Sequence, residues 1–251
     1  MQPILRVQNL VKEYKNGFRA VDNVSFEVGP GEIFGLLGPN GAGKTTIIRT
    51  ISTVLSFSYG KIEVLGVDNR KEAEKVRQNI GILTTDIGAY ERFTGRENLR
   101  YFGKLYGLSG KNLEKKIDEL SSLLDMKDFI DKRAGNYSTG MKQRLAIARS
   151  VIHSPKVIIF DEPTSGLDVL ASQTVRNFMQ HYKDLGRAVV FSTHQMYDAE
   201  KLCDRVIIIH KGKMVAYESV EDLKTKTSSL DLEDAFLKLV GRNSGAMAAS
   251  V

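Results

Sequence analysis

Hydrophobic residues along the chain follow two patterns that are typical of strands. Val24, Phe26 and Val28 alternate with polar residues, which is the period of a strand with one buried face. Residues 33–37 and 157–160 are almost continuously apolar, as in strands of a parallel sheet that are buried on both faces. Further strands are expected at residues 60–65, 80–83, 188–192 and 205–210.

Apolar residues spaced three or four apart predict helices between these strands. The longest such region, about residues 94–150, contains Leu99 and Phe102 and, farther on, Ile117 and Leu120. Strands that alternate with helices indicate an α/β fold with a parallel sheet, and the helical region is inserted between its two halves. Other helices are expected at residues 44–55, 169–185, 197–202 and 232–240.

The composition excludes some classes of protein but does not indicate a function. Hydrophobic residues make up 42% and charged residues 26% of the 251 residues, as in an ordinary globular protein, which excludes disordered and fibrous classes. The formal net charge of +6 leaves the partner open, because the lysines and arginines form no block. The single cysteine, Cys203, excludes an internal disulfide, and we interpret it as a small buried residue.

Membrane insertion and secretion are not expected from the sequence. The aliphatic runs are far shorter than the roughly 20 residues that cross a bilayer. The first residues lack the charged-then-apolar pattern of a signal peptide. We therefore expect a cytosolic protein with one domain over residues 1–240 and a flexible tail over residues 241–251.

A glycine-rich segment follows the apolar run at residues 33–37. Its glycines let backbone N–H groups point inward, and the start of the next helix adds partial positive charge, so the segment suits a phosphate. Lys44 would reach the β- and γ-phosphates, and the Thr45 hydroxyl would bind Mg²⁺. The segment matches the phosphate-binding pattern Gly-x4-Gly-Lys-Ser/Thr with Gly38, Pro39, Asn40, Gly41, Ala42, Gly43, Lys44 and Thr45.

Two acidic residues, Asp161 and Glu162, come directly after the apolar run at residues 157–160. The carboxyl ends of strands form the edge at which open α/β sheets bind ligands. Asp161 would hold Mg²⁺, and Glu162 would polarise the water that attacks the γ-phosphate. Without the phosphate-binding loop, the same pair would be interpreted as exposed acids of a turn.

The segment Tyr137-Ser-Thr-Gly-Met-Lys-Gln143, hereafter the signature segment, lies between these two motifs. Ser138 suits the N-cap position of the helix that follows, and Gly140 lets a ligand approach the backbone. On its own, the segment is as consistent with an ordinary capped helix as with a binding site.

Taken in order, these motifs resemble the ATP-binding subunit of ATP-binding-cassette (ABC) transporters over essentially residues 1–240. The turn that ends at Asp168, and His194 after the strand at residues 188–192, complete the family's set. The resemblance implies a phosphate-loop NTPase core, an N-terminal antiparallel β subdomain and an inserted helical subdomain at about residues 94–150.

The resemblance also assigns roles to individual residues. The ring of Tyr14 would stack on adenine, and residues 38–46, which end at Thr46, would bind the phosphates of ATP. Thr45 and Asp161 would bind Mg²⁺, and Asp168 would belong to the family's D-loop. The catalytic residues would be Glu162, His194 and Lys44.

The partners expected for such a subunit also follow from the resemblance. Two copies, or this chain and a homologous ATPase, would dimerise head to tail on binding ATP. Membrane-spanning permease subunits would be separate chains, with this protein on the cytoplasmic face of the cell membrane, and no nucleic acid is expected. Each ATP would then be contacted in trans by the second copy's Ser138, Thr139, Gly140 and Met141.

Two segments depart from the commonest form of the family. Thr85 occupies the position of the family's glutamine, so the oxygen offered to Mg²⁺ there would come from Thr85 or Asp86. In the signature segment Tyr137, Thr139 and Met141 replace Leu, Gly and Gln. This version resembles the exporter branch that includes sodium-extrusion and drug-resistance ATPases.

We therefore expect the ATP-hydrolysing motor of an ABC exporter, with sodium extrusion as the closest resemblance. The alternative is a soluble ABC ATPase of DNA repair or translation. Those proteins carry a long coiled-coil insertion or two cassettes in one chain, and residues 44–161 leave no room for a long heptad run. An import motor is disfavoured, because importers often carry the glutamine-type loop.

Overall fold

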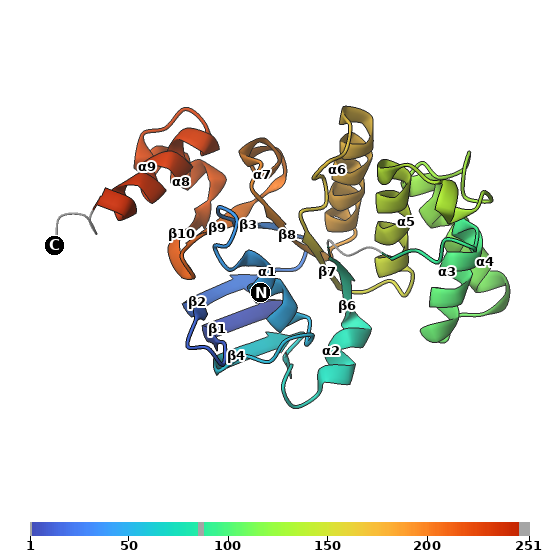
Figure 1. Ribbon diagram of the computed structural model, residues 1–251, viewed down its shortest axis with the longest axis horizontal. Helices are drawn as coiled ribbons and strands as arrows, with labels where there is room; N and C mark the ends of the chain where they lie inside the picture. The colour runs from blue at the N-terminus through green and yellow to red at the C-terminus, as the bar shows by residue number, and fades with distance from the viewer. Residues whose placement is uncertain (1, 85–87, 246–251) are drawn as a thin grey trace.

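The computed structural model describes residues 2–84 and 88–245, and its strands form two sheets (Figure 1). The antiparallel sheet has the order β2-β1-β4-β5 and the main sheet has the order β10-β9-β3-β8-β7-β6. The antiparallel sheet consists of β1 (Leu5–Glu13), β2 (Arg19–Val28), β4 (Tyr59–Val64) and β5 (Val67–Asp68). The main sheet consists of β3 (Ile33–Leu37), β6 (Ile80–Leu83), β7 (Val157–Asp161), β8 (Ala188–Thr193), β9 (Arg205–His210) and β10 (Lys213–Ser219).

The antiparallel sheet confirms the expected β subdomain. Strand β1 pairs antiparallel with β2 on one side and with β4 on the other. Val24, Phe26 and Val28 are buried, as their alternation with polar residues predicts. Their shared face places this sheet against the rest of the core.

The main sheet is parallel from β9 through β3, β8 and β7 to β6. Both β3 and β7 are buried along their whole length, which explains their continuous apolar sequence. Strand β10 pairs antiparallel with β9 at the edge, and the sequence analysis did not predict it. The parallel order brings the carboxyl ends of β3, β7 and β8 to one edge of the sheet.

The two faces of the main sheet bury separate clusters of apolar residues. On one face, Phe34 and Ile159 pack with Ile47 and Ile51 of α1 (Lys44–Ile51) and with the antiparallel sheet. The apolar residues of the opposite face form one cluster with residues from several helices (Figure 1). These helices include α5 (Thr139–Val151), α6 (Val169–Asp184), α7 (Met196–Leu202) and α9 (Leu232–Gly245).

The helical region between β6 and β7 forms one end of the molecule, opposite α9 (Figure 1). It consists of α3 (Gly95–Leu105), α4 (Gly110–Leu123), the short 3₁₀ helix η1 (Ala134–Asn136) and α5. Thr94 and Glu97 form a capping box that starts α3. Leu99, Ile117 and Leu120 are buried in one cluster with α5, as the helical spacing predicts.

Several element boundaries differ from the sequence-based expectation. Helix α1 ends at Ile51 rather than at residue 55: the Ser52 hydroxyl donates to the Ile48 carbonyl, and Thr53 takes a left-handed φ of 61°. Helix α9 extends to Gly245, and residues 246–251 of the expected flexible tail lie outside the described residues. The short α2 (Ala73–Asn79) and α8 (Val220–Thr227) were not predicted.

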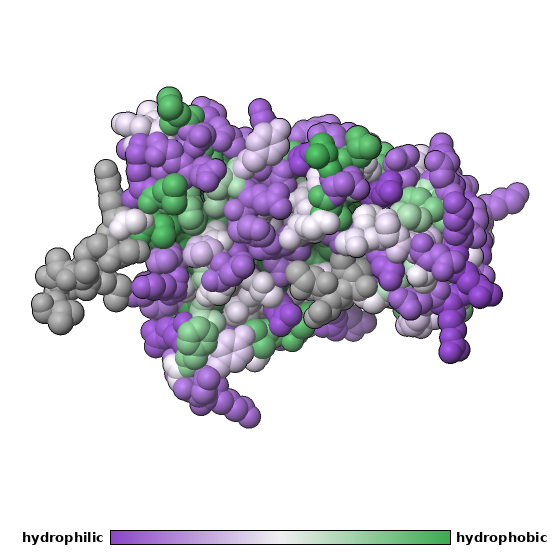
Figure 2. Space-filling view, turned by 45° about the horizontal axis from the view of Figure 1, so that its top comes forward, coloured by the Kyte–Doolittle hydropathy of each residue, from purple (hydrophilic) through white to green (hydrophobic). Residues whose placement is uncertain are grey.

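No helix within the described residues is both long and apolar enough to span a bilayer. The face shown in Figure 2 is mostly hydrophilic, with small separate apolar areas. Cys203 is buried, and burial raises the pKa of its thiol, as expected of a small core residue.

Candidate functional site

The phosphate-binding loop connects the end of β3 to the start of α1, as its sequence predicts. Gly43 has a φ of 110°, and a Cβ there would lie 2.5 Å from the Ala20 carbonyl oxygen, so only glycine fits. The backbone is therefore free to turn its N–H groups toward a bound anion. Lys44 is 5% exposed, and its Nζ donates to the carbonyls of Gly38 at 2.7 Å and Pro39 at 3.2 Å.

The Lys44 ammonium lies close to the two acids at the end of β7, Asp161 and Glu162. Its Nζ lies 3.8 Å from Oε1 of Glu162. Burial lowers the pKa of the ammonium, and the charges of Glu162 and Asp161 oppose that shift. The two carboxylates therefore favour the charged form of the buried lysine, which is the form that can attract a phosphate.

Asp161 lies at the carboxyl end of β7, next to the first turn of α1. The Thr45 hydroxyl donates to its Oδ2 at 2.8 Å, and the Ser192 hydroxyl donates to its Oδ1. Ser192 is the neighbour of Asp161 in the β7–β8 register, and the sequence analysis missed it. A hydroxyl and a carboxylate in contact are oxygen donors of the kind that Mg²⁺ prefers.

Glu162 has a left-handed φ of 50°, which is uncommon for a residue with a side chain. Its backbone N–H donates to the carbonyl and the hydroxyl of Ser192, both at 3.1 Å, and these bonds hold the turn. Its Oε2 lies 2.7 Å from Nδ1 of His194, which follows β8. Backbone strain of this kind persists where the surroundings enforce it, often at functional sites.

A cavity of about 280 Å³ lies over the phosphate-binding loop. Tyr14 is at its rim, with its ring stacked against Phe18 at a centroid distance of 6.4 Å. Phe18 has no motif of its own and was not predicted. The cavity is lined by Tyr14, Phe18, Ala20, Asn40, Gly41, Ala42, Gly43, Lys44, Thr45, Thr46 and Glu162.

The signature segment lines a different cavity of about 330 Å³, which shares only Glu162 with the first among the described residues. Ser138 caps α5, and its hydroxyl accepts from the Met141 N–H at 3.3 Å. Gln143 Nε2 donates to the Pro163 carbonyl at 2.7 Å. The second cavity is lined by Thr84, Thr139, Lys142, Gln143, Asp161, Glu162 and Ser165.

The turn after Glu162 is held by buried polar contacts that the sequence did not indicate. Asp198 is 1% exposed and accepts from the Thr164 hydroxyl at 2.6 Å and from Arg176 at 2.8 Å. Asp168 caps α6 by accepting from the Ala171 N–H at 2.8 Å. Thr85 and Asp86, the expected oxygen donors of the loop after β6, lie outside the described residues.

Comparison with known proteins decides the family. The family model described as "ABC transporter" matches residues 21–165. The ABC transporter ATP-binding protein NatA of Bacillus subtilis (strain 168) is 43% identical over 231 residues, which are 91% of this chain and 94% of that protein. This chain belongs to the ABC transporter family. It is thus an ATP-binding transporter subunit and an ATPase, as the motif order predicts.

Other relatives agree with this assignment. The daunorubicin resistance ATP-binding protein DrrA3 of Streptomyces coeruleorubidus is 36% identical over 92% of this chain and 72% of its own. A solved ATP-binding subunit of an ABC transporter superimposes with a TM-score of 0.87 at 29% identity, over 94% of this chain and 99% of the other. The structure of CbiO1 from Clostridium perfringens, part of the transporter complex CbiONQ, gives a TM-score of 0.81 at 26% identity, over 90% and 92% of the two chains. ABC subunits of this kind work with separate permease subunits, and dimerisation is general in the family.

Proposed function

We propose that this chain is the motor subunit of an ABC exporter and drives transport through separate membrane-spanning permease subunits. The observation that carries the ATP-hydrolysing role is the meeting of five side chains at one edge of the main sheet: Lys44, Thr45, Asp161, Glu162 and His194. Residues 1–240 would form the ATP-binding domain and residues 94–150 its signature subdomain. The protein would act on the cytoplasmic face of the cell membrane.

ATP would occupy the cavity over the phosphate-binding loop. The backbone N–H groups of residues 40–46 would surround the β- and γ-phosphates, and Lys44 would exchange its carbonyl contacts for phosphate oxygens. Tyr14, with Phe18 behind it, offers an aromatic face to the adenine. The ring lies at the open rim of the cavity, where a base can stack without entering the core.

Thr45 and Asp161 would hold Mg²⁺, which neutralises charge on the phosphates when it is bound. Their hydrogen bond of 2.8 Å places two oxygen donors together. Mg²⁺ usually takes only one or two carboxylates from the protein and fills its other positions with water and phosphate oxygens, so this donor set fits. Ser192 would orient Asp161 from the side away from Thr45.

Glu162 would act as the general base for hydrolysis. It would accept a proton from water as the new P–O bond forms and the bond between the γ-phosphorus and the bridging oxygen breaks, releasing ADP and phosphate. The contact between His194 Nδ1 and Glu162 Oε2 would keep the carboxylate oriented toward that water. His194 is 46% exposed on its side chain and so remains accessible to a γ-phosphate.

Two copies would enclose each ATP in a head-to-tail dimer. Supporting this, the signature segment does not line the cavity over the phosphate-binding loop within the described residues of one chain. The N-terminus of α5, with Ser138 and Gly140, carries the partial positive charge that suits the γ-phosphate of a second copy. Asp168, which caps α6, would lie in the turn between the two copies.

Export is favoured by the form of the signature segment and by relatives whose names include a drug-resistance protein. The sodium ion is the cargo that we propose to test first. DNA repair or translation is less well supported, because the helices between β6 and β7 have only 11, 14 and 13 residues, too short for a long coiled coil.

The decisive experiment is co-purification with a candidate permease subunit, followed by reconstitution in vesicles. We expect ATP hydrolysis that is stimulated in the complex and vesicle transport that requires ATP. Sodium efflux would be measured first and drug efflux second. ATPase activity that responds to DNA or ribosomes and not to the permease would contradict the proposal.

A further inference from the structure

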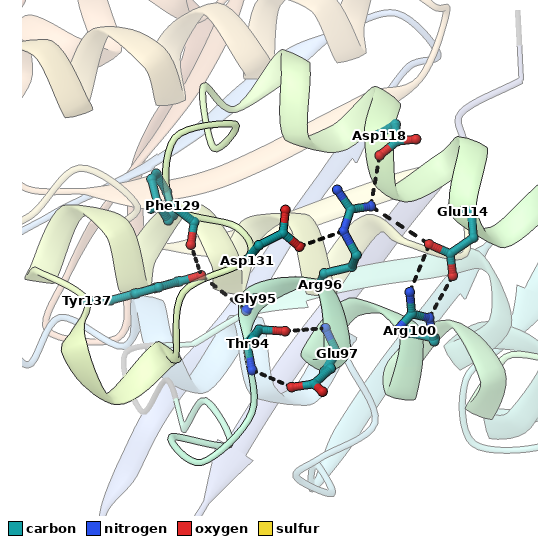
Figure 3. Close-up of polar contacts among 10 residues, drawn as sticks. All are labelled: Thr94, Gly95, Arg96, Glu97, Arg100, Glu114, Asp118, Phe129, Asp131 and Tyr137. Atoms are coloured by element: carbon teal, nitrogen blue, oxygen red, sulfur yellow. Dashed lines mark hydrogen bonds and ion pairs between the residues drawn. The ribbon is translucent and has the colours of Figure 1, made fainter.

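Tyr137, the first residue of the signature segment, makes two buried hydrogen bonds through its hydroxyl (Figure 3). The hydroxyl donates to the Phe129 carbonyl at 2.8 Å and accepts from the Gly95 N–H at 3.1 Å. The side chain is 6% exposed, and its ring packs edge-on against Phe129. One side chain therefore joins the signature segment to the start of α3 and to the turn before η1.

The contact with Gly95 satisfies a helix terminus. The first N–H groups of a helix have no partner within it. In α3 the Gly95 N–H donates to Tyr137, the Arg96 N–H donates to the Ile130 carbonyl at 2.9 Å, and the Glu97 N–H donates to Thr94 Oγ1 at 3.1 Å. Tyr137 thus helps to cap α3, a helix that begins 42 residues earlier in the chain.

Gly95 and Tyr137 fit each other sterically. A Cβ on residue 95 would lie 2.5 Å from the Tyr137 hydroxyl oxygen and 3.0 Å from the Ile130 carbonyl oxygen. A side chain at position 95 would therefore have to displace the tyrosine hydroxyl. A leucine at position 137, as in the commonest form of the signature, has no group that could accept from the Gly95 N–H.

Burial raises the pKa of the Tyr137 hydroxyl, which favours the protonated form that donates to the Phe129 carbonyl. The nearby ion pairs of Arg96 are more exposed than this hydroxyl, because the side chains of their partners Asp118 and Asp131 are 65% and 68% exposed. Exposed pairs of this kind contribute little to stability. The Tyr137 hydroxyl, by contrast, makes its two hydrogen bonds inside the protein and joins the signature segment directly to the start of α3.

We propose that Tyr137 is a positioning residue for the trans site: its hydroxyl fixes the signature segment relative to α3 before a second copy docks. Ser138, the next residue, caps α5 and would face the second copy's γ-phosphate. Loss of the Tyr137 hydroxyl leaves the Gly95 N–H without a partner and lets the start of α5 move relative to α3. The inference rests on the proposed ATP-dependent dimer.

The test is the change Tyr137→Phe in a Glu162→Gln background, which keeps bound ATP from being hydrolysed. Sedimentation with ATP should show the dissociation constant of the dimer raised about tenfold, or about 1.4 kcal/mol. Binding of a fluorescent ATP analogue to dilute monomer should not change, because Tyr137 does not line the cavity over the phosphate-binding loop. In the hydrolytically active chain, turnover should recover at high protein concentration.

Tyr182→Phe is a matched control, because the Tyr182 hydroxyl is also buried. It donates to the Pro155 carbonyl at 2.7 Å and accepts from Arg187 Nη1 at 2.8 Å, away from the signature segment. The control should lose a similar amount of thermal stability and leave dimerisation unchanged. Equal weakening of the dimer in both variants would reduce Tyr137 to a general stabiliser and overturn the inference.

Gly95→Ala gives a second test that keeps the hydroxyl but displaces it. Dimerisation with ATP should weaken, as in Tyr137→Phe. The dissociation constant of the double variant should be no higher than that of the more affected single variant, since both changes act on one contact. Unchanged dimerisation in Tyr137→Phe and Gly95→Ala would also overturn the inference. A parent chain that does not associate with ATP would instead contradict the proposed dimer.

Discussion

The two halves of the candidate ATP site are built in different ways. The phosphate-binding side is centred on one short segment, residues 38–46, which runs from the end of β3 into the first turn of α1, with Asp161 and Glu162 beside it. The signature side depends on contacts between distant segments, such as the bond between Gly95 and Tyr137, 42 residues apart. On the phosphate-binding side, loss of a charged group or a metal ligand should therefore reduce ATP binding or hydrolysis. On the signature side, loss of the alignment between distant segments should weaken dimerisation.

Lys44→Ala should have the largest effect and should act on the phosphate-binding side alone. We expect hydrolysis to be abolished and ATP affinity of the monomer to fall roughly 10²-fold, since a charged hydrogen bond contributes up to about 3 kcal/mol. Equilibrium binding of labelled ATP and a phosphate-release assay measure both effects. Near-normal hydrolysis would remove this loop from the site.

Glu162→Gln should separate chemistry from binding on the same side. Hydrolysis should fall about 10²–10⁴-fold, because the carboxamide cannot act as a base, while ATP stays bound through Lys44 and Thr45. Asp161→Asn should lose Mg²⁺-dependent affinity as well as rate. The nucleotide that each variant retains after rapid desalting with Mg²⁺ distinguishes them, and parent-like turnover in Glu162→Gln would assign the base elsewhere.

Ser192→Ala tests whether Ser192, which only the structure identified, orients the proposed Mg²⁺ ligand Asp161. We expect Mg²⁺-ATP affinity to fall about tenfold, because Asp161 loses a hydrogen bond to a charged acceptor. Affinity for ATP measured with EDTA should not change. An equal loss with and without Mg²⁺ would show that Ser192 acts on the turn at Glu162 and not on the metal.

Ser138→Ala should have the smallest effect and should act on the signature side. Loss of an N-cap costs about 1 kcal/mol, so dimerisation with ATP should weaken about fivefold while ATP affinity of the monomer is kept. Ser219→Ala is the matched control, since Ser219 caps α8 in the same way, through the Asp222 N–H at 3.1 Å. The two variants should lose similar stability, but only Ser138→Ala should alter sedimentation with ATP.

Much of the phosphate-binding side could be predicted because its chemistry is local. Glycines at fixed spacing, a lysine and a hydroxyl between a buried strand and a helix specify a loop whose backbone forms the site. The acids Asp161 and Glu162 were also found, since a parallel strand of apolar residues delivers whatever follows it to one edge of the sheet. Both strands involved, β3 and β7, begin where the hydrophobic pattern predicts.

The ending of α1 shows where local patterns are insufficient. The apolar spacing continues to residue 55, but Ser52 bonds back to the helix and Thr53 adopts a left-handed conformation. Strand β10 was missed because an edge strand is only half-buried and its hydrophobic pattern is weak. The end of α1 is thus set by local polar contacts that apolar spacing does not report, whereas β10 depends on its pairing with β9.

The sequence by itself determined the family, the order of the motifs and the side chains available for phosphate chemistry. Each of these can be identified from short segments of consecutive residues. Only the tertiary structure decided which side chains meet. The register of β7 and β8 sets Ser192 beside Asp161, and the packing of α3 on the signature segment sets Tyr137 beside Gly95. The residues of each pair lie far apart in the chain. They meet because the burial of apolar faces aligns whole helices and strands. The sequence around each polar residue does not show which partner this alignment will bring to it.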